Sequence, residues 1–440
     1  MSKTLKDSMI IGFAIFAVFF GAGNLIFPPY IGLASGSHWG IAVIGLALSG
    51  ILLPLISIIA VQNMGGSLQA LTRPIAPWFF NVYMLIVLLM GISMTIPRTA
   101  GVAFEVGFKG IFPNAPPYSV YLFLIAYFAV TYCFANDRKS VIDNIGKLLT
   151  PVLLVSLIFI IIMAIVKPLG VPAGPGTSSP FANAFITGYQ TGDILTGLLC
   201  GVIFIEAIKG KGYADPKSTN RVTLISVSIA ALGLCIVYGG LLYLGATGAA
   251  FFPQDTDQTD LLVGLVRKLI GSGGIAVLSI GVSLACLTTT IGLITAAADF
   301  LSGLSGNKIS FKMCVGILST IGIFVASIGV KAIIGYAYPI FMLLYPTTII
   351  MTLLGVFNKF VPNEGAWKGA ITMTVLIGLY DCFDALNIIG AINVQTPVLD
   401  SLIDLIPLSG TGLTWIVPAV AGFAGGALIK HLMNKAALPR

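Results

Sequence analysis

The sequence is poor in charge. Only 9% of its 440 residues are charged, whereas soluble domains carry roughly 25%. Hydrophobic residues make up 57%, and the mean hydropathy is +1.02. A water-soluble chain of this length could not cover its surface with so few charges. The shortage therefore excludes an ordinary soluble protein and indicates lipid as the surrounding solvent.

Residues for enzymatic and metal chemistry are scarce as well. The chain has two histidines, His38 and His431, and its six cysteines lie in apolar runs without Cys-x-x-Cys spacing. It contains neither a Ser/His/Asp arrangement nor a phosphate-binding Gly-x4-Gly-Lys-Ser/Thr loop. These absences argue against an enzyme and against a nucleotide-driven pump. The net charge of +7 is better explained by basic cytoplasmic loops than by a nucleic-acid partner.

What the chain has in abundance is apolar stretches of about 20 residues, the length that crosses a bilayer. We expect an all-α polytopic membrane protein with twelve transmembrane helices in a single transporter domain, 1–440. The stretch 248–272 is too polar to span and is expected to form an extracellular helical cap or a plain connection. The expected spans are 8–33, 40–62, 78–105, 118–135, 148–167, 183–207, 222–247, 273–302, 313–330, 333–357, 369–391 and 411–432.

Basic residues fall mainly in alternate loops of this arrangement. If the N-terminus is inside, all but six of the 23 Lys and Arg residues lie in cytoplasmic segments. The six others are Arg98, Lys109, Lys167, Arg267, Lys268 and Lys331. Because cytoplasmic loops of membrane proteins carry an excess of Lys and Arg, we expect both termini on the cytoplasmic side.

Two spans contain sequences at which a helix readily unwinds, because glycine costs about 1 kcal/mol in a helix interior and proline removes a backbone hydrogen bond. The first span carries Gly21-Ala22-Gly23-Asn24 near its midpoint, then Pro28-Pro29, and the sixth carries Gly188-Tyr189-Gln190-Thr191-Gly192-Asp193. Since the broken spans are the first and the sixth, we expect a five-plus-five inverted repeat with halves 8–167 and 183–357 and accessory helices at 369–432.

An unwound point inside a membrane exposes N–H groups of one half-helix and C=O groups of the other. The N–H groups, at the positive end of a helix dipole, suit a carboxylate, and the C=O groups suit a cation or an ammonium group. The first break can therefore hold both ends of an amino-acid zwitterion. A simple kink, or close helix packing through the two glycines, remains the alternative.

The third span carries an arginine, Arg98, where a charge is expensive. Such a residue usually faces a cavity or an acidic partner. Its partner could be Glu105 on the same helix face, Asp193 in the second break, or a substrate carboxylate. Alternatively, Arg98 lies near the outer end of its span and extends its side chain to the membrane interface.

Three consecutive threonines, Thr288, Thr289 and Thr290, interrupt the apolar eighth span. Hydroxyl and carbonyl oxygens are the ligands that hard cations prefer, and sodium, being monovalent, needs no carboxylate. We predict that at least two of the three hydroxyls bind a cation. The alternative is that each hydroxyl donates to a carbonyl one turn earlier.

Three segments resemble the branched-chain amino-acid system II carriers, the leucine/isoleucine/valine:cation symporter family of bacteria. They are 19–29 in the first span, 96–99 in the third and 188–191 in the sixth. The resemblance covers essentially the whole chain. This family in turn is similar to the leucine-transporter-type fold, in which a Gly-x-Gly-Asn break in span one holds the amino acid and span eight helps to hold sodium.

The resemblance implies roles for individual residues. Sodium would be bound by the carbonyls of Ala17, Phe20 and Ala285 and the hydroxyls of Thr288 and Thr289. The substrate carboxylate would meet the N–H groups of Ala22 and Gly23, and its ammonium group would meet carbonyls near Phe19 and in the sixth-span break. The other substrate-binding candidates are Gly21, Asn24, Arg98, Gly188, Tyr189, Gln190 and Thr191.

The function that the resemblance implies is import of leucine, isoleucine and valine with Na+ as the coupling ion, by alternating access, in a bacterial inner or plasma membrane. Proton-coupled relatives of the fold can place a lysine inside span five, whereas Lys147 and Lys167 lie at its two ends here, which favours sodium. The alternatives are a proton-coupled carrier of another small amino acid and a channel, which would need a continuous polar pore. The expected partners are the substrate and membrane lipid, and the sequence leaves the oligomeric state open.

Overall fold

The computed structural model describes residues 3–136, 141–174, 176–306, 308–394 and 396–436, with side chains described for all of these except 141–153. Within this part of the chain every regular element is helical, mostly α-helix with short 3-10 and π-helical turns. The structure confirms the all-α class that the apolar composition predicts.

The first half of the chain forms five groups of helices, one for each of the first five expected spans. They are α1 (Lys3–Phe19) with α2 (Ala22–Ser35); α3 (Trp39–Ala47), η2 (Leu48–Leu52) and α4 (Leu53–Asn63); α6 (Phe79–Met90), η3 (Gly91–Thr95), α7 (Ile96–Val102) and η4 (Ala103–Phe108); α9 (Ser119–Asn136); and α10 (Val141–Val166). The short helices η1 (Gly36–His38), α5 (Leu68–Thr72) and α8 (Lys109–Ile111) connect them.

The second half continues in the same way. The sixth to tenth expected spans correspond to α11 (Pro180–Tyr189) with α12 (Asp193–Gly210), α13 (Pro216–Thr247), α15 (Ser272–Leu304), α16 (Phe311–Ala326) and α17 (Val330–Val356). The accessory spans are α18 (Glu364–Ile388) and α20 (Ile416–Ala436). Outside the expected spans lie α14 (Gln258–Ile270), η5 (Asn358–Phe360) and α19 (Pro397–Asp404).

Eight helices of the described chain are long and apolar enough to cross a membrane, or nine if the bent pair α11 and α12 is one span. This number is smaller than the twelve expected spans for three reasons: the continuous run Ala22–Asn63 joins parts of the first two spans, the helix Phe311–Ala326 is short, and side chains of the fifth span are described only over Leu154–Val166. The run Ala22–Asn63 has 42 residues. At about 1.5 Å per residue it would be twice as long as a bilayer of roughly 30 Å is thick, and a turn at Gly36, with φ +51°, divides it.

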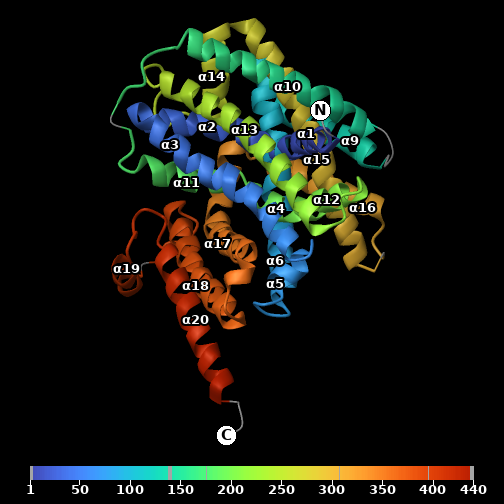
Figure 1. Ribbon diagram of the computed structural model, residues 1–440. Helices are drawn as coiled ribbons and strands as arrows, with labels where there is room; N and C mark the ends of the chain where they lie inside the picture. Colours follow the sequence, from blue (N-terminus) through green and yellow to red (C-terminus); the bar gives the residue numbers. More distant parts are fainter. Residues whose placement is uncertain (1–2, 137–140, 175, 307, 395, 437–440) are drawn as a thin grey trace.

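Small residues allow the accessory helices to pack closely. Figure 1 shows α18 and α20 side by side at one edge of the molecule, next to α17. A Cβ placed on Gly365 or Gly369 of α18 would lie 2.2 or 2.0 Å from a backbone oxygen of α20, at Gly426 and Gly422 respectively. Only glycine permits this approach, which is typical of membrane helices.

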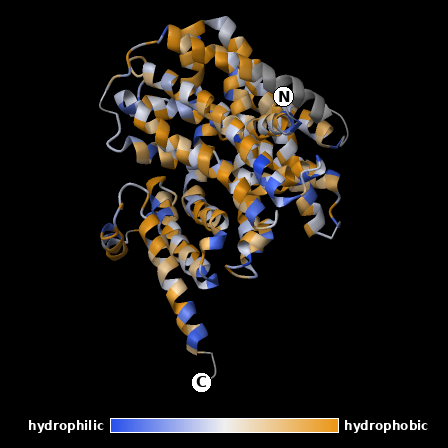
Figure 2. Ribbon diagram, in the orientation of Figure 1, coloured by the Kyte–Doolittle hydropathy of each residue, from blue (hydrophilic) through white to orange (hydrophobic). Residues whose placement is uncertain are grey.

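The polar segments collect at the helix ends, where Figure 2 shows hydrophilic residues. Asp7 of α1 accepts a hydrogen bond from Tyr213 at 2.9 Å and pairs with Lys211 at 3.3 Å. The N-terminal helix and the basic loop after α12 therefore lie on the same side of the protein. The basic residues Arg138, Lys139 and Arg440, also expected to be cytoplasmic, lie outside the described residues.

Candidate functional site

The first expected break is present in the structure. Helix α1 ends at Phe19 and α2 begins at Ala22, with Gly21 between them in an extended conformation (φ −105°, ψ −178°). A Cβ placed on Gly21 would meet no atom within 4 Å, so the break borders open space. Ala22 and Gly23 are the first residues of α2, where backbone N–H groups have no partner inside the helix.

The second break lies between α11, which ends at Tyr189, and α12, which begins at Asp193. The two helices are bent by 49° relative to each other. Gly192 supplies the turn with φ +77°, in the left-handed region that favours glycine. The Thr191 hydroxyl donates to the Gly188 carbonyl at 2.9 Å and accepts from the Asp193 N–H at 3.3 Å, which holds the broken segment in shape.

The two breaks face each other. The Asn24 amide of α2 donates to the Asp193 carboxylate at 2.7 Å, and it also contacts the Phe19 carbonyl and the Tyr238 hydroxyl of α13. Asn24, Asp193 and Tyr238 are all buried. An amide nitrogen has two hydrogens, so three acceptors surround a group that can satisfy two of them. Three oxygens from three helices therefore converge on one point beside the first break.

Arg98 lies on the other side of the same region. Its Nη1 donates to the Gln190 carbonyl in the second break at 2.6 Å, and its guanidinium lies 5.7 Å from the Phe27 ring centre. A Cβ on Gly23 would be 3.3 Å from Nη2 of Arg98. The residue is only 4% exposed, which excludes the alternative of a side chain extended to the membrane interface. Its Nε is buried without a hydrogen-bond partner among the described residues.

The other residues of the second break mainly pack. A Cβ on Gly188 would lie 2.1 Å from the Ser49 hydroxyl, so this glycine allows α11 to approach η2. The Tyr189 ring stacks on Tyr345 of α17 with centres 4.4 Å apart, and its hydroxyl accepts a hydrogen bond from Trp415 at 3.3 Å. The absence of a side chain at Gly188 and the ring of Tyr189 thus support the break, while the Gln190 backbone contacts Arg98.

The predicted cation ligands of α15 are close together. The hydroxyls of Thr288 and Thr289 both donate to the Ala285 carbonyl at 2.9 Å, so three oxygens cluster on one face of the helix. Thr290 points elsewhere and bonds the Tyr127 hydroxyl of α9 at 2.8 Å. The bonds of Thr288 and Thr289 correspond to the back-bonding alternative, whereas the bond of Thr290 to another helix does not. In the described part of the chain no hydrogen bond joins α1, which carries Ala17, to these threonines.

Glu105 has different partners from those expected. Its carboxylate accepts from the Thr259 hydroxyl of α14 at 2.6 Å and from the Val330 N–H at the start of α17 at 3.0 Å. Further contacts hold α14 in place, since Arg267 donates to the Gly110 carbonyl at 3.0 Å. Sequence spacing placed Glu105 and Arg98 on one helix face, but the π-helical turn η4 begins between them and changes that register.

Two solved structures share this architecture. The chain superposes on MhsT in complex with L-phenylalanine with a TM-score of 0.57, at 16% identity, covering 96% of this chain and 97% of that one. It superposes on Mhp1, a nucleobase-cation-symport-1 family transporter, with a TM-score of 0.55, at 12% identity, covering 98% and 93%. The chain is thus a multi-pass membrane protein of the leucine-transporter-type fold.

The chain is more similar in sequence to several transport proteins than to these two solved structures. Residues 4–433 match the family model of the branched-chain amino acid transport protein, and the chain belongs to this family. The branched-chain amino acid permease BraB of Bacillus subtilis is 33% identical over 97% of this chain and 96% of its own length. The branched-chain amino acid transport system 2 carrier protein of Pseudomonas aeruginosa is 32% identical over 98% and 97%. The protein is therefore a transport protein and not an enzyme.

Proposed function

We propose that the protein is a sodium-coupled symporter that imports leucine, isoleucine and valine by alternating access. The observation that carries the proposal is the meeting of two helix breaks with a buried guanidinium and a buried carboxylate beside them. Arg98 and the N–H groups of Ala22 and Gly23 suit the substrate carboxylate, and Asp193 with the Phe19 carbonyl suits its ammonium group.

Arg98 and Asp193 form no ion pair within 4 Å of each other, although each is only 4% exposed. Each buried charge lacks the other as a direct partner, and an unpaired buried charge is costly. An amino-acid zwitterion placed between them would supply the missing charge to both. The names of the relatives support a substrate with a branched aliphatic side chain, because they describe permeases and carriers of branched-chain amino acids.

Sodium would bind between α1 and α15. The clustered oxygens of Ala285, Thr288 and Thr289 offer half of a site, and the carbonyls of Ala17 and Phe20 at the end of α1 would complete it. The same end of α1 carries Phe19, which borders the substrate position. Binding of sodium would thus stabilise the position of α1 that also binds substrate, and such differential affinity is what coupling requires.

A specific observation favours proton coupling as the second candidate. Asp193 is a buried carboxylate inside a broken membrane helix, and intramembrane carboxylates form proton relays in pumps and transporters.

We retain the twelve spans, the repeat halves 8–167 and 183–357, the accessory helices 369–432 and the cytoplasmic termini in a bacterial cell membrane as parts of the proposal.

Uptake into proteoliposomes with imposed gradients tests the coupling. Labelled leucine should accumulate when sodium is high outside and the pH is equal on both sides, and unlabelled isoleucine and valine should compete. A pH gradient without sodium should drive no accumulation. Accumulation driven by the pH gradient alone would favour the proton-coupled carrier, and uptake that never exceeds equilibration under any gradient would favour a channel.

A further inference from the structure

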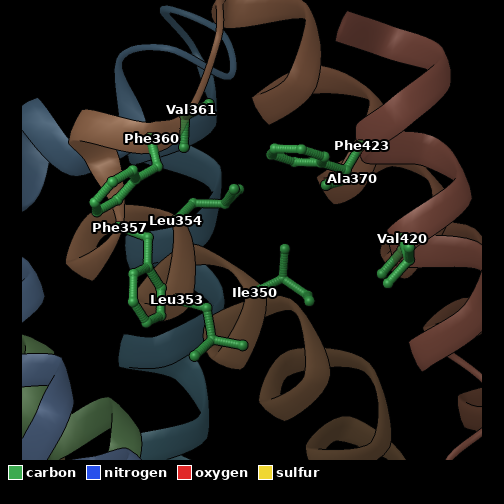
Figure 3. Close-up of a pocket in the computed structure, with 10 residues that line it drawn as sticks. Ile350, Leu353, Leu354, Phe357, Phe360, Val361, Ala370, Val420 and Phe423 are labelled. Atoms are coloured by element: carbon green, nitrogen blue, oxygen red, sulfur yellow. The ribbon is translucent and has the colours of Figure 1, made fainter.

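An apolar groove runs between α17, α18 and α20, away from the helix breaks. It has a volume of about 270 Å³, and ten hydrocarbon side chains line it. Figure 3 shows Ile350 and Leu353 of α17 on one side and Val420 and Phe423 of α20 on the other, with Ala370 of α18 between. Because α18 packs against both α17 and α20, the groove is the space that these two helices leave between them.

The groove faces outward. Val420 is 64% exposed, and at the other wall Phe357 is 54% and Phe360 is 83% exposed. Helix α20 is the least covered of the candidate spans, with 11% of its most apolar stretch buried. In a membrane protein, exposed apolar surface of this kind is in contact with lipid chains.

One end of the groove is positively charged. Lys359 lies in η5 between the groove residues Phe357 and Phe360, and it is exposed. Lys430 of α20 lies beside the first turn of α18, where a Cβ placed on Gly365 would be 2.5 Å from its Cβ. Neither lysine forms an ion pair with another described residue.

A third lysine, Lys368, lies near the same end, but it pairs with Glu364 at 3.7 Å. Glu364 is the acidic residue in the first turn of α18, and its charge is thus already matched. Lys359 and Lys430 therefore leave an uncompensated positive charge at the end of a carbon-lined groove. This combination is complementary to a molecule with a long apolar chain and an anionic head.

We propose that the groove binds an anionic phospholipid, with one acyl chain between α17 and α20 and the phosphate next to Lys359 and Lys430. A lysine near an anionic lipid surface contributes on the order of a fivefold gain in affinity. The apolar walls hold the chain, and the two lysines select the charge of the headgroup. A second copy of the protein, or a zwitterionic lipid with no preference, is a distinct outcome of the test.

Native mass spectrometry of the full-length protein in detergent measures the lipid that stays bound. We expect phosphatidylglycerol to be retained more than phosphatidylethanolamine with the same acyl chains. Replacing both lysines (Lys359→Ala with Lys430→Ala) should lower phosphatidylglycerol affinity by roughly 25-fold and leave phosphatidylethanolamine unchanged. The matched control is Lys209→Ala with Lys217→Ala, two exposed lysines of another segment, which should change neither.

A second variant tests the groove itself. Val420→Trp places a large side chain at its exposed wall and should lower retention of both lipids without unfolding the protein. Inorganic phosphate, which has no acyl chain, should not displace the bound lipid. Equal retention of the two lipids by the native protein, or loss of phosphatidylglycerol in the control variant, would overturn the proposal. So would a dimer that dissociates in Val420→Trp, because a second copy would then occupy the groove.

Discussion

Asn24 and Asp193 are 169 positions apart in the chain, yet Nδ2 of Asn24 lies 2.7 Å from Oδ2 of Asp193. This hydrogen bond joins the first turn of α2 to the first residue of α12, the two half-helices that follow the breaks. Both side chains are buried, and Tyr238 of α13 contacts the same amide. The two breaks are therefore parts of one site, which no single segment of the sequence contains.

The charge of Asp193 can be removed without changing its size. Asp193→Asn should weaken leucine binding by roughly 10- to 100-fold, because a hydrogen bond to a charged group is worth about 1.5–3 kcal/mol. Equilibrium binding of labelled leucine to the purified protein measures it. The matched control is Asp215→Asn, which removes a carboxylate that caps α13 in the loop after α12, at the other end of that helix from Asp193, and it should leave leucine affinity unchanged. If Asp193→Asn binds leucine as tightly as the native protein does, the Asp193 carboxylate does not contact the substrate.

Gly23 leaves little room for a side chain. A Cβ at this position would lie 3.2 Å from the Phe27 ring and 3.3 Å from Arg98, on the side where the substrate carboxylate is proposed to bind. Gly23→Leu is expected to abolish leucine binding while the protein still inserts into the membrane. Gly40→Leu, where a Cβ would meet nothing within 4 Å, is the control and should bind normally. Normal uptake by Gly23→Leu would show that the first break is merely a kink.

Valine substitutions of the three threonines of α15 are expected to have different effects. Thr288→Val or Thr289→Val removes one proposed sodium ligand and should raise the sodium concentration for half-maximal uptake by roughly one to two orders of magnitude. Thr290→Val should not change sodium dependence. It should instead lower the free energy of unfolding by about 1–3 kcal/mol, because it leaves the buried Tyr127 hydroxyl without its partner.

Uptake measured against sodium concentration, together with thermal unfolding, decides between the two possible roles of these hydroxyls. If Thr288 and Thr289 only bond the Ala285 carbonyl, both valine variants will show the native sodium dependence. That result would remove the main residue-level support for sodium as the coupling ion.

Glu105 anchors α14 to the transmembrane helices through Thr259 and Val330. Glu105→Ala removes both hydrogen bonds, and each bond to a charged group is worth about 1.5–3 kcal/mol. We expect amide hydrogen exchange within α14 to accelerate by at least roughly tenfold, measured by mass spectrometry. Glu364→Ala, at an exposed pair, serves as the control and should not affect α14. Unchanged exchange would mean that α14 is held by its apolar contacts alone.

The orientation of the chain can be measured with single cysteines in a cysteine-free background. Ala214→Cys lies in the basic loop after α12, and Asp255→Cys lies in the polar segment before α14; both positions are exposed. In right-side-out vesicles, an impermeant thiol reagent added outside should label position 255 and not position 214. The opposite pattern would invert the proposed topology.

The local composition of the sequence determined where the helices and the two helix breaks of this protein lie. Apolar runs placed a helix or a group of helices at each expected span, and the glycines near Gly21 and at Gly192 placed both breaks. These features depend on the solubility of a segment in lipid and on backbone freedom, which neighbouring residues decide. The π-helical turns η2, η3 and η4 were not anticipated, because a single inserted residue in a helix leaves no periodic signal in so uniformly apolar a sequence.

Only the tertiary structure decided which buried polar groups meet. From the sequence, Arg98 had Glu105, Asp193 and the substrate as possible partners, but it bonds the Gln190 carbonyl, and Glu105 bonds α14 and α17 instead. Tyr238, which completes the cluster around Asn24, gave no signal because nothing in the sequence distinguishes it from Tyr243 in the same apolar span. A buried hydrogen bond depends on the position of two groups to within a fraction of an ångström, and helix packing sets that position.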